Sequence, residues 1–121
     1  MGKDKTLVLG ASENPNRYSN KAMLRLLDKG HKIVAIGKQK GAVAGVPIVT
    51  EQQPMDDIDT VTLYLNPLNQ KAYYDYILSL KPRRIIFNPG TENDELERKA
   101  ASIGIDVLEA CTLVMLGTGQ Y

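Results

Sequence analysis

The segment Gly10-Ala11-Ser12 has the residue types of a phosphate-binding turn. It follows an apolar run from Thr6 to Leu9 and precedes a segment with helical spacing. A glycine lets the backbone approach an anion, and the first amides of a following helix offer free N–H donors at the positive end of the helix dipole. The sequence therefore predicts a phosphate or nucleotide ligand here, although an ordinary strand-to-helix turn uses the same residues.

A second polar segment, residues 37–41, indicates what else that ligand carries. A fold that binds NAD usually has an Asp or Glu after its second strand and opens with Gly-x-Gly-x-x-Gly, and neither feature is present. Lys38 and Lys40 stand where the carboxylate would be. Because ammonium groups bind phosphate, the sugar end of the ligand is expected to be phosphorylated. Coenzyme A, with its 3′-phosphate, and NADP, with its 2′-phosphate, are the two candidates.

Further polar residues follow other apolar runs of the chain. In an open parallel sheet, ligands bind beyond the carboxyl ends of the strands where the strand order reverses, usually at the first and fourth strands in sequence. The expected cofactor-binding residues are Gly10, Ala11, Ser12, Asn14, Arg17, Tyr18, Ser19, Lys38, Lys40, Asn66 and Asn88. The Asn-Pro pairs that begin at Asn66 and Asn88 also suit plain turns, so a structural role for them stays open.

The elements that must position these residues alternate between strand and helix patterns. Short apolar runs without strict polar alternation predict strands covered on both faces, at 6–9, 33–36, 46–49, 61–65, 85–87 and 105–108. Apolar residues at three-to-four spacing predict helices at 22–27, 68–80 and 91–103, and one helical turn is expected at 51–55. Gly30 is expected to end the first helix, and Asn66 and Thr91 are expected to cap the other two.

This alternation predicts an α/β fold with a doubly wound parallel sheet, Rossmann-like and built of three layers, α/β/α. The length of 121 residues suits a single domain, residues 1–121. No apolar run approaches the roughly 20 residues of a membrane span, and the charged start of the chain lacks the apolar core of a secretory signal. We therefore expect a cytoplasmic protein without membrane association.

Charge and reactive residues exclude several function classes. The net charge is +1, which argues against nucleic acid as a partner. Residues 1–48 nevertheless hold nine Lys/Arg and three Asp/Glu, whereas residues 49–121 hold six and eleven, so the half with the predicted turn is basic. One cysteine, Cys111, and one histidine, His31, lie far apart in sequence and predict neither a metal site nor a catalytic residue.

At this point the residues resemble those of the small CoA-binding proteins, whose domain is similar to the CoA-binding domain of the succinyl-CoA synthetase α subunit. The resemblance covers nearly the whole chain and lies in residues 8–12, 14–15, 17–19, 43–47, 88–90 and 109–116. It implies that Gly10, Ala11 and Ser12 contact a pyrophosphate, that Arg17 and Ser19 flank it, and that the loop after the second strand holds the adenosine phosphate. Many relatives carry Asn-Pro where this chain has Gly37-Lys38.

Three functions remain open from the sequence. The first is a module that binds CoA or an acyl-CoA and has no catalytic machinery of its own, with a homodimer or an unknown protein as possible partner. The second is an enzyme or enzyme subunit, either a small NADP-dependent reductase or a chain that presents CoA to a ligase. The third is a mixed disulfide between Cys111 and the CoA thiol. The small size of the chain argues against a complete reductase, because hydride transfer needs a covered substrate site as well.

Overall fold

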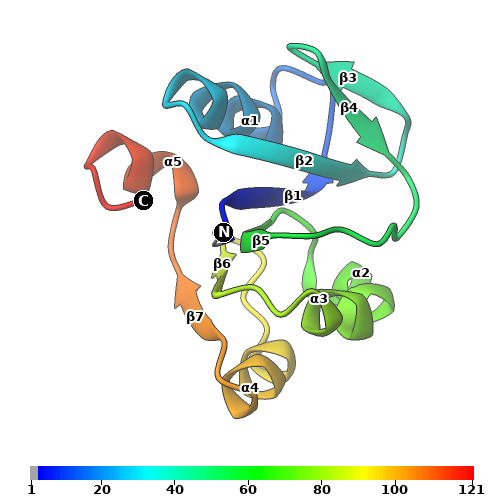
Figure 1. Cartoon of the computed structure of the whole chain (residues 1–121), viewed down its shortest axis with the longest axis vertical. Coiled ribbons are helices and arrows are strands. Elements are labelled where there is room, and N and C mark those ends of the chain that lie inside the picture. The colour runs from blue at the N-terminus through cyan, green and yellow to red at the C-terminus, as the bar shows by residue number, and fades with distance from the viewer. Residues whose placement is uncertain (1–2) are drawn as a thin grey trace.

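The computed structural model describes residues 3–121 and is built on a seven-stranded sheet (Figure 1). The strand order is β3-β4-β2-β1-β5-β6-β7, and all neighbours are parallel except the antiparallel pair of β3 and β4. The strands are β1 (Lys5–Ala11), β2 (Lys32–Gly37), β3 (Gly41–Val43), β4 (Val46–Val49), β5 (Ile58–Leu63), β6 (Arg84–Phe87) and β7 (Asp106–Glu109). The order reverses at β1, so the predicted doubly wound, Rossmann-like α/β fold is confirmed.

Helices cover both faces of the sheet (Figure 1). On one face lie α1 (Tyr18–Asp28) and α5 (Thr112–Gly117), whose Met23, Leu26 and Leu116 pack in one buried cluster with Val8. On the other lie α2 (Pro67–Gln70), a 3-10 turn (Lys71–Tyr73), α3 (Tyr74–Leu80) and α4 (Asp94–Ser102). Ile77 and Leu96 of these helices pack with Leu7 and Leu9 in a second cluster. Each fully buried side chain of this size stabilises the fold by about 1.5–3 kcal/mol.

Two parts of the region between β2 and β5 differ from the prediction. Residues 41–43 form the strand β3, which was not predicted, and Ala44 (φ 49°) with Gly45 (φ 85°) makes the two-residue turn into β4. Positive φ at both positions is typical of a type I′ hairpin, but Ala-Gly is a weaker signal for it than Asn-Gly. The helical turn expected at 51–55 is wrong. That segment is neither helix nor strand, and a hydrogen bond from Gln52 Nε2 to the Ala72 carbonyl (2.7 Å) joins it to the 3-10 turn before α3.

The helices on the second face also differ in detail. The helix predicted at 68–80 is broken by the 3-10 turn, at the point where the Ala72 carbonyl accepts the bond from Gln52. Asn66 does cap it, because its Oδ1 accepts from the Asn69 amide (2.9 Å). Thr91 does not cap α4; Asn93 does, with Oδ1 accepting from the Leu96 amide at 3.2 Å. None of the helices in residues 3–121 is long and apolar enough to cross a membrane.

Candidate functional site

A cavity of about 700 Å³ opens at the carboxyl ends of β1, β2, β5 and β6, where the strand order reverses. Its volume lies in the ordinary range for sites that hold a cofactor-sized molecule. Four loops line it, contributing residues 10–14 and 16–19, residues 38–40, residues 64–66 with 69, and residues 89–91. Ten of the eleven expected residues are among them: Gly10, Ala11, Ser12, Asn14, Arg17, Tyr18, Ser19, Lys38, Lys40 and Asn66.

The loop between β1 and α1 is shaped by its own side chains. Ser12 Oγ accepts from the Asn14 amide (3.0 Å), and Asn14 Oδ1 accepts from the Asn16 amide (2.9 Å). Asn20 Nδ2 donates to the Ser12 carbonyl (3.0 Å) and ties the loop to α1. Such side-chain turns fix a loop without a strand or helix ladder. The backbone of this cavity wall is therefore held in place before any ligand arrives.

Four backbone amides of this wall have no acceptor within the described residues 3–121: those of Ser12, Glu13, Tyr18 and Ser19. The last two belong to the first turn of α1, where Arg17 provides no side-chain cap and no acidic residue is present. Unpartnered amides at the positive end of a helix dipole attract an anion. The geometry therefore suits a negatively charged group between the loop and the start of α1.

Gly10 has a packing role that the sequence did not predict. Its φ is +98°, and a Cβ built on it would lie 3.0 Å from the Tyr64 carbonyl carbon and 3.2 Å from the Leu65 nitrogen. The missing side chain thus makes room for the loop after β5, while Gly10 also lines the cavity. A side chain here would be strained in conformation and would also push the two central loops apart.

Several residues that line the cavity were missed from the sequence, and Glu13 and Tyr64 are two of them. Glu13 Oε2 accepts from the Ala42 amide of β3 (2.9 Å). The Tyr64 hydroxyl is buried without a hydrogen-bond partner in the described chain, and burial raises the pKa of Tyr64 to about 12. It is therefore a neutral phenol near pH 7. An exposed Glu in a loop and a Tyr at the end of an apolar run carry no sequence signal for either role.

Asn88 does not line the cavity and is buried instead. Its Nδ2 donates to Thr62 Oγ1 (2.7 Å) and to the Leu63 carbonyl (2.9 Å), and its Oδ1 accepts from the Thr112 amide (2.8 Å). The side chain thus joins β6, β5 and the start of α5. Asn88 therefore has the structural role that the sequence had left open.

The single cysteine and the single histidine of the sequence also lie outside the cavity lining. Cys111 is a half-buried free thiol directly before α5. His31 precedes β2, and its ring packs edge-on against Tyr121 with centroids 4.8 Å apart. Because His31 lies at the amino ends of the strands, it is at the opposite end of the sheet from the cavity.

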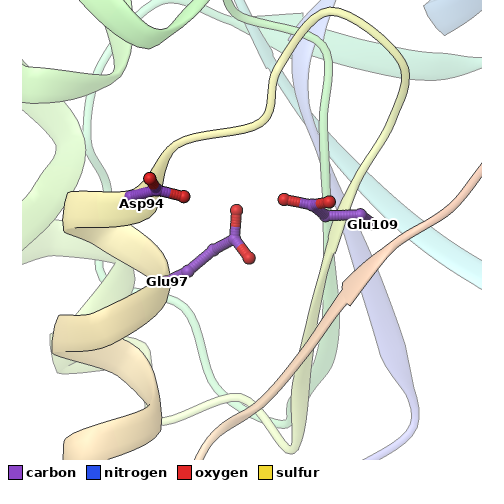
Figure 2. Close-up of side chains that lie close together, drawn as sticks. All are labelled: Asp94, Glu97 and Glu109. Atoms are coloured by element: carbon purple, nitrogen blue, oxygen red, sulfur yellow. The ribbon is translucent and has the colours of Figure 1, made fainter.

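A separate group of carboxylates lies on α4 and β7, where Asp94, Glu97 and Glu109 point toward one another (Figure 2). One oxygen from each lies within 4.8 Å of the others. Partial burial and the neighbouring Glu109 carboxyl raise the pKa of Glu97 above its usual value. The sequence pattern does not reveal this group, because its members span positions 94 to 109 on two elements that only the fold brings together.

Comparison with known proteins adds a family and several solved relatives. Residues 4–117 match the family model described as CoA binding domain. A solved protein described only as uncharacterized has a TM-score of 0.95 and 50% identity, with all of both chains covered. A Thermus thermophilus protein has a TM-score of 0.86 and 20% identity, covering 98% of this chain and 91% of its own.

Part of a larger enzyme has the same fold. Acetyl-coenzyme A synthetase 1 of Ca. Korarchaeum cryptofilum, solved with phosphate and ADP, has a TM-score of 0.73 and 21% identity. The match covers 90% of this chain and 26% of the enzyme. At such identities these last two likenesses show a shared fold. No curated protein matches the chain.

Proposed function

The chain belongs to the CoA binding domain family, and from this premise we propose how its cavity receives CoA or an acyl-CoA. The diphosphate lies against residues 10–12 and the first amides of α1, with Arg17 and Ser19 beside it. The 3′-phosphate of the adenosine lies near Lys38 and Lys40. Asn14, Tyr18 and Asn66 line the remaining wall.

The observation that carries this proposal is the set of unpartnered amides in the β1–α1 wall of the cavity. A diphosphate has oxygens enough to accept from several of them at once. Lys38 and Lys40 are exposed on the facing loop, and neither forms an ion pair within residues 3–121. A charge-assisted hydrogen bond contributes about 1.5–3 kcal/mol, which is roughly a ten- to hundredfold change in affinity.

The proposed role is binding, as a carrier or sensor of CoA, rather than catalysis. Among the described residues that line the cavity there is no histidine or cysteine, and Tyr64 holds its proton near pH 7. General acid–base catalysis needs a group whose pKa lies near the working pH. The amides and lysines of the lining are suited to recognising the charge and shape of a ligand, which supports a binding role.

Calorimetric titration with CoA, dephospho-CoA and NADP tests the proposal. We expect CoA to bind about ten- to a hundredfold more tightly than dephospho-CoA, because only CoA carries the 3′-phosphate. Lys38→Ala and Lys40→Ala should weaken CoA binding and leave dephospho-CoA binding unchanged. Lys29→Ala removes an exposed lysine at the far end of α1 and serves as control. Equal affinity for CoA and dephospho-CoA would refute the role of the lysines, and tighter binding of NADP would refute CoA as the ligand.

A further inference from the structure

The Lys38–Lys40 loop is bounded by two glycines that both press against the β1–α1 segment. A Cβ on Gly37 would overlap the Ala11 carbonyl oxygen and lie 3.0 Å from Ile48 Cγ2. A Cβ on Gly41 would lie 2.6 Å from both carboxylate oxygens of Glu13. Neither glycine has a positive φ, so space rather than backbone conformation requires them. The loop is therefore fixed to the opposite cavity wall at both of its ends.

The contact at Gly41 includes a hydrogen bond to the edge of the sheet. Ala42 lies on β3, the edge strand, and is paired with Pro47 of β4. Hydrogen-bonded and non-hydrogen-bonded pairs alternate along an antiparallel ladder, and the Ala42 N–H points away from β4 and donates to Glu13 Oε2 at 2.9 Å. Glu13 thus satisfies an edge-strand amide that would otherwise face solvent.

The charge of Glu13 is the wrong sign for a phosphate site. A carboxylate in the lining of the cavity opposes any nearby anion, and Glu13 forms no ion pair with Lys38 or Lys40 in the described part of the chain. Its hydrogen bond to Ala42 and the space left by Gly41 account for its place there. The two lysines remain free to meet a ligand.

We propose that Glu13 is a positioning residue that holds the Lys38–Lys40 loop over the cavity and so sets the preference for a ligand phosphorylated on the adenosine sugar. This inference rests on the proposed binding of CoA. Glu13 does not contact the 3′-phosphate; it fixes the backbone from which both lysines extend. Mobile lysines lose binding free energy when they are ordered by a ligand, and a fixed backbone reduces that loss.

The test compares the ratio of dephospho-CoA to CoA dissociation constants across variants. Glu13→Ala removes the acceptor, and the ratio is expected to fall about tenfold, mostly through weaker CoA binding. Glu13→Gln keeps an oxygen for the Ala42 amide and removes the charge, so the ratio is expected to stay at or above the wild-type value. Gly41→Ala should act like Glu13→Ala by displacing the carboxylate. Gly41→Ala should not change the ratio further in the Glu13→Ala background, where the carboxylate that its methyl group would displace is absent.

Hydrogen exchange at the Ala42 amide, measured without ligand, provides an independent readout. The amide should exchange about tenfold faster in Glu13→Ala than in the wild type and at a nearly unchanged rate in Glu13→Gln. Asp28→Ala, which removes an exposed carboxylate at the far end of α1, should change neither readout. Weaker discrimination and faster exchange, both restored by Gln, would support the inference.

The outcomes separate failure of this inference from failure of the proposed function. If the wild type binds CoA and Glu13→Ala keeps the same ratio, the role of Glu13 is overturned and CoA binding stands. If both Glu13→Ala and Glu13→Gln bind CoA more tightly, Glu13 acts only by repulsion and the positioning role is overturned. If the wild type does not bind CoA, the proposed function fails and the inference fails with it, whatever the exchange rates are.

Discussion

Three asparagines that follow strands or precede helices have different roles, and their hydrogen bonds show which role each one has. Asn14 and Asn66 are exposed and use one oxygen each for a local turn or cap. Asn88 is buried and uses both ends of its amide. An exposed amide with free donors can still meet a ligand, whereas a fully bonded one cannot without breaking the fold.

We predict that Asn88→Ala destabilises the protein without a specific effect on ligand binding. The change removes three hydrogen bonds and leaves the Thr112 amide and the Leu63 carbonyl short of a buried partner. A loss of about 3 kcal/mol in the free energy of unfolding is expected from urea denaturation. The CoA dissociation constant, measured on folded protein, should change less than about twofold. Unchanged stability with a large loss of affinity would mean that Asn88 contacts the ligand after all.

At the scale of residues, the sequence predicts where a residue lies better than it predicts which contact requires it there. Gly10 was expected to be needed at the turn, and it is, but the group that requires its missing Cβ is Tyr64. Lys38 and Lys40 were predicted from their place after the second strand, where an NAD-binding fold carries a carboxylate, and both line the cavity. Glu13 could not be foreseen, because its partner Ala42 lies on a strand that the pattern did not reveal.

Among the elements, the pairing of α4 with β7 brings like charges together. Asp94 and Glu97 lie in the first turn of α4, where the helix dipole favours carboxylates. Glu109 of β7 faces them (Figure 2). Burial first, and then the Glu109 carboxyl, raise the pKa of Glu97.

This arrangement predicts a pH-dependent stability that Glu97→Gln removes. A raised pKa in the folded state means that the contribution of Glu97 to stability is present below its ordinary pKa and is lost as the pH rises through the folded-state value. The variant cannot ionise, and its amide oxygen can still accept from the Asn93 amide. It should be more stable than the wild type at pH 7 by about 0.5 kcal/mol, because solvent screens this half-exposed group.

Thermal unfolding of wild type and variant from pH 4 to pH 7 measures the effect. The difference between them should shrink as the pH falls, because wild-type Glu97 then becomes neutral too. Glu51→Gln, which removes an exposed carboxylate elsewhere, serves as control and should leave stability unchanged. A constant difference across this range would contradict the link to protonation of Glu97.

Element boundaries were predictable where the signal is local and were wrong where it depends on partners. The strand at 46–49 and the Asn66 cap were predicted correctly, since both follow from neighbouring residues. The irregular segment at 51–55 is held by Gln52 and by Gln53, whose carbonyl accepts from Tyr76 OH of α3 (2.5 Å). Contacts across 20 or more positions leave no periodic trace in a single sequence.

Across the whole molecule, the residues proposed to bind the ligand and a cluster expected to stabilise the fold lie at opposite ends of the strands. The cavity lies at the carboxyl ends of the strands. At the amino ends, Arg84 is buried against the Tyr121 ring, 4.5 Å from its centroid, and donates to the Tyr121 carbonyl at 3.2 Å. The Tyr121 hydroxyl hydrogen-bonds Thr6, and its ring also meets His31. One aromatic residue therefore joins the starts of β1, β2 and β6.

We predict that Tyr121→Ala lowers stability and leaves ligand affinity unchanged. Loss of the ring removes the cation–π contact with Arg84, the bond to Thr6 and the packing on His31. The expected cost is about 2–3 kcal/mol in the free energy of unfolding, whereas Tyr121→Phe, which keeps the ring, should cost about 1 kcal/mol. Lys38→Ala should instead weaken CoA binding and leave the free energy of unfolding unchanged. If Tyr121→Ala also weakened CoA binding in folded protein, the cluster at the amino ends of the strands would be coupled to the cavity at their carboxyl ends, and the strands would have to transmit the change.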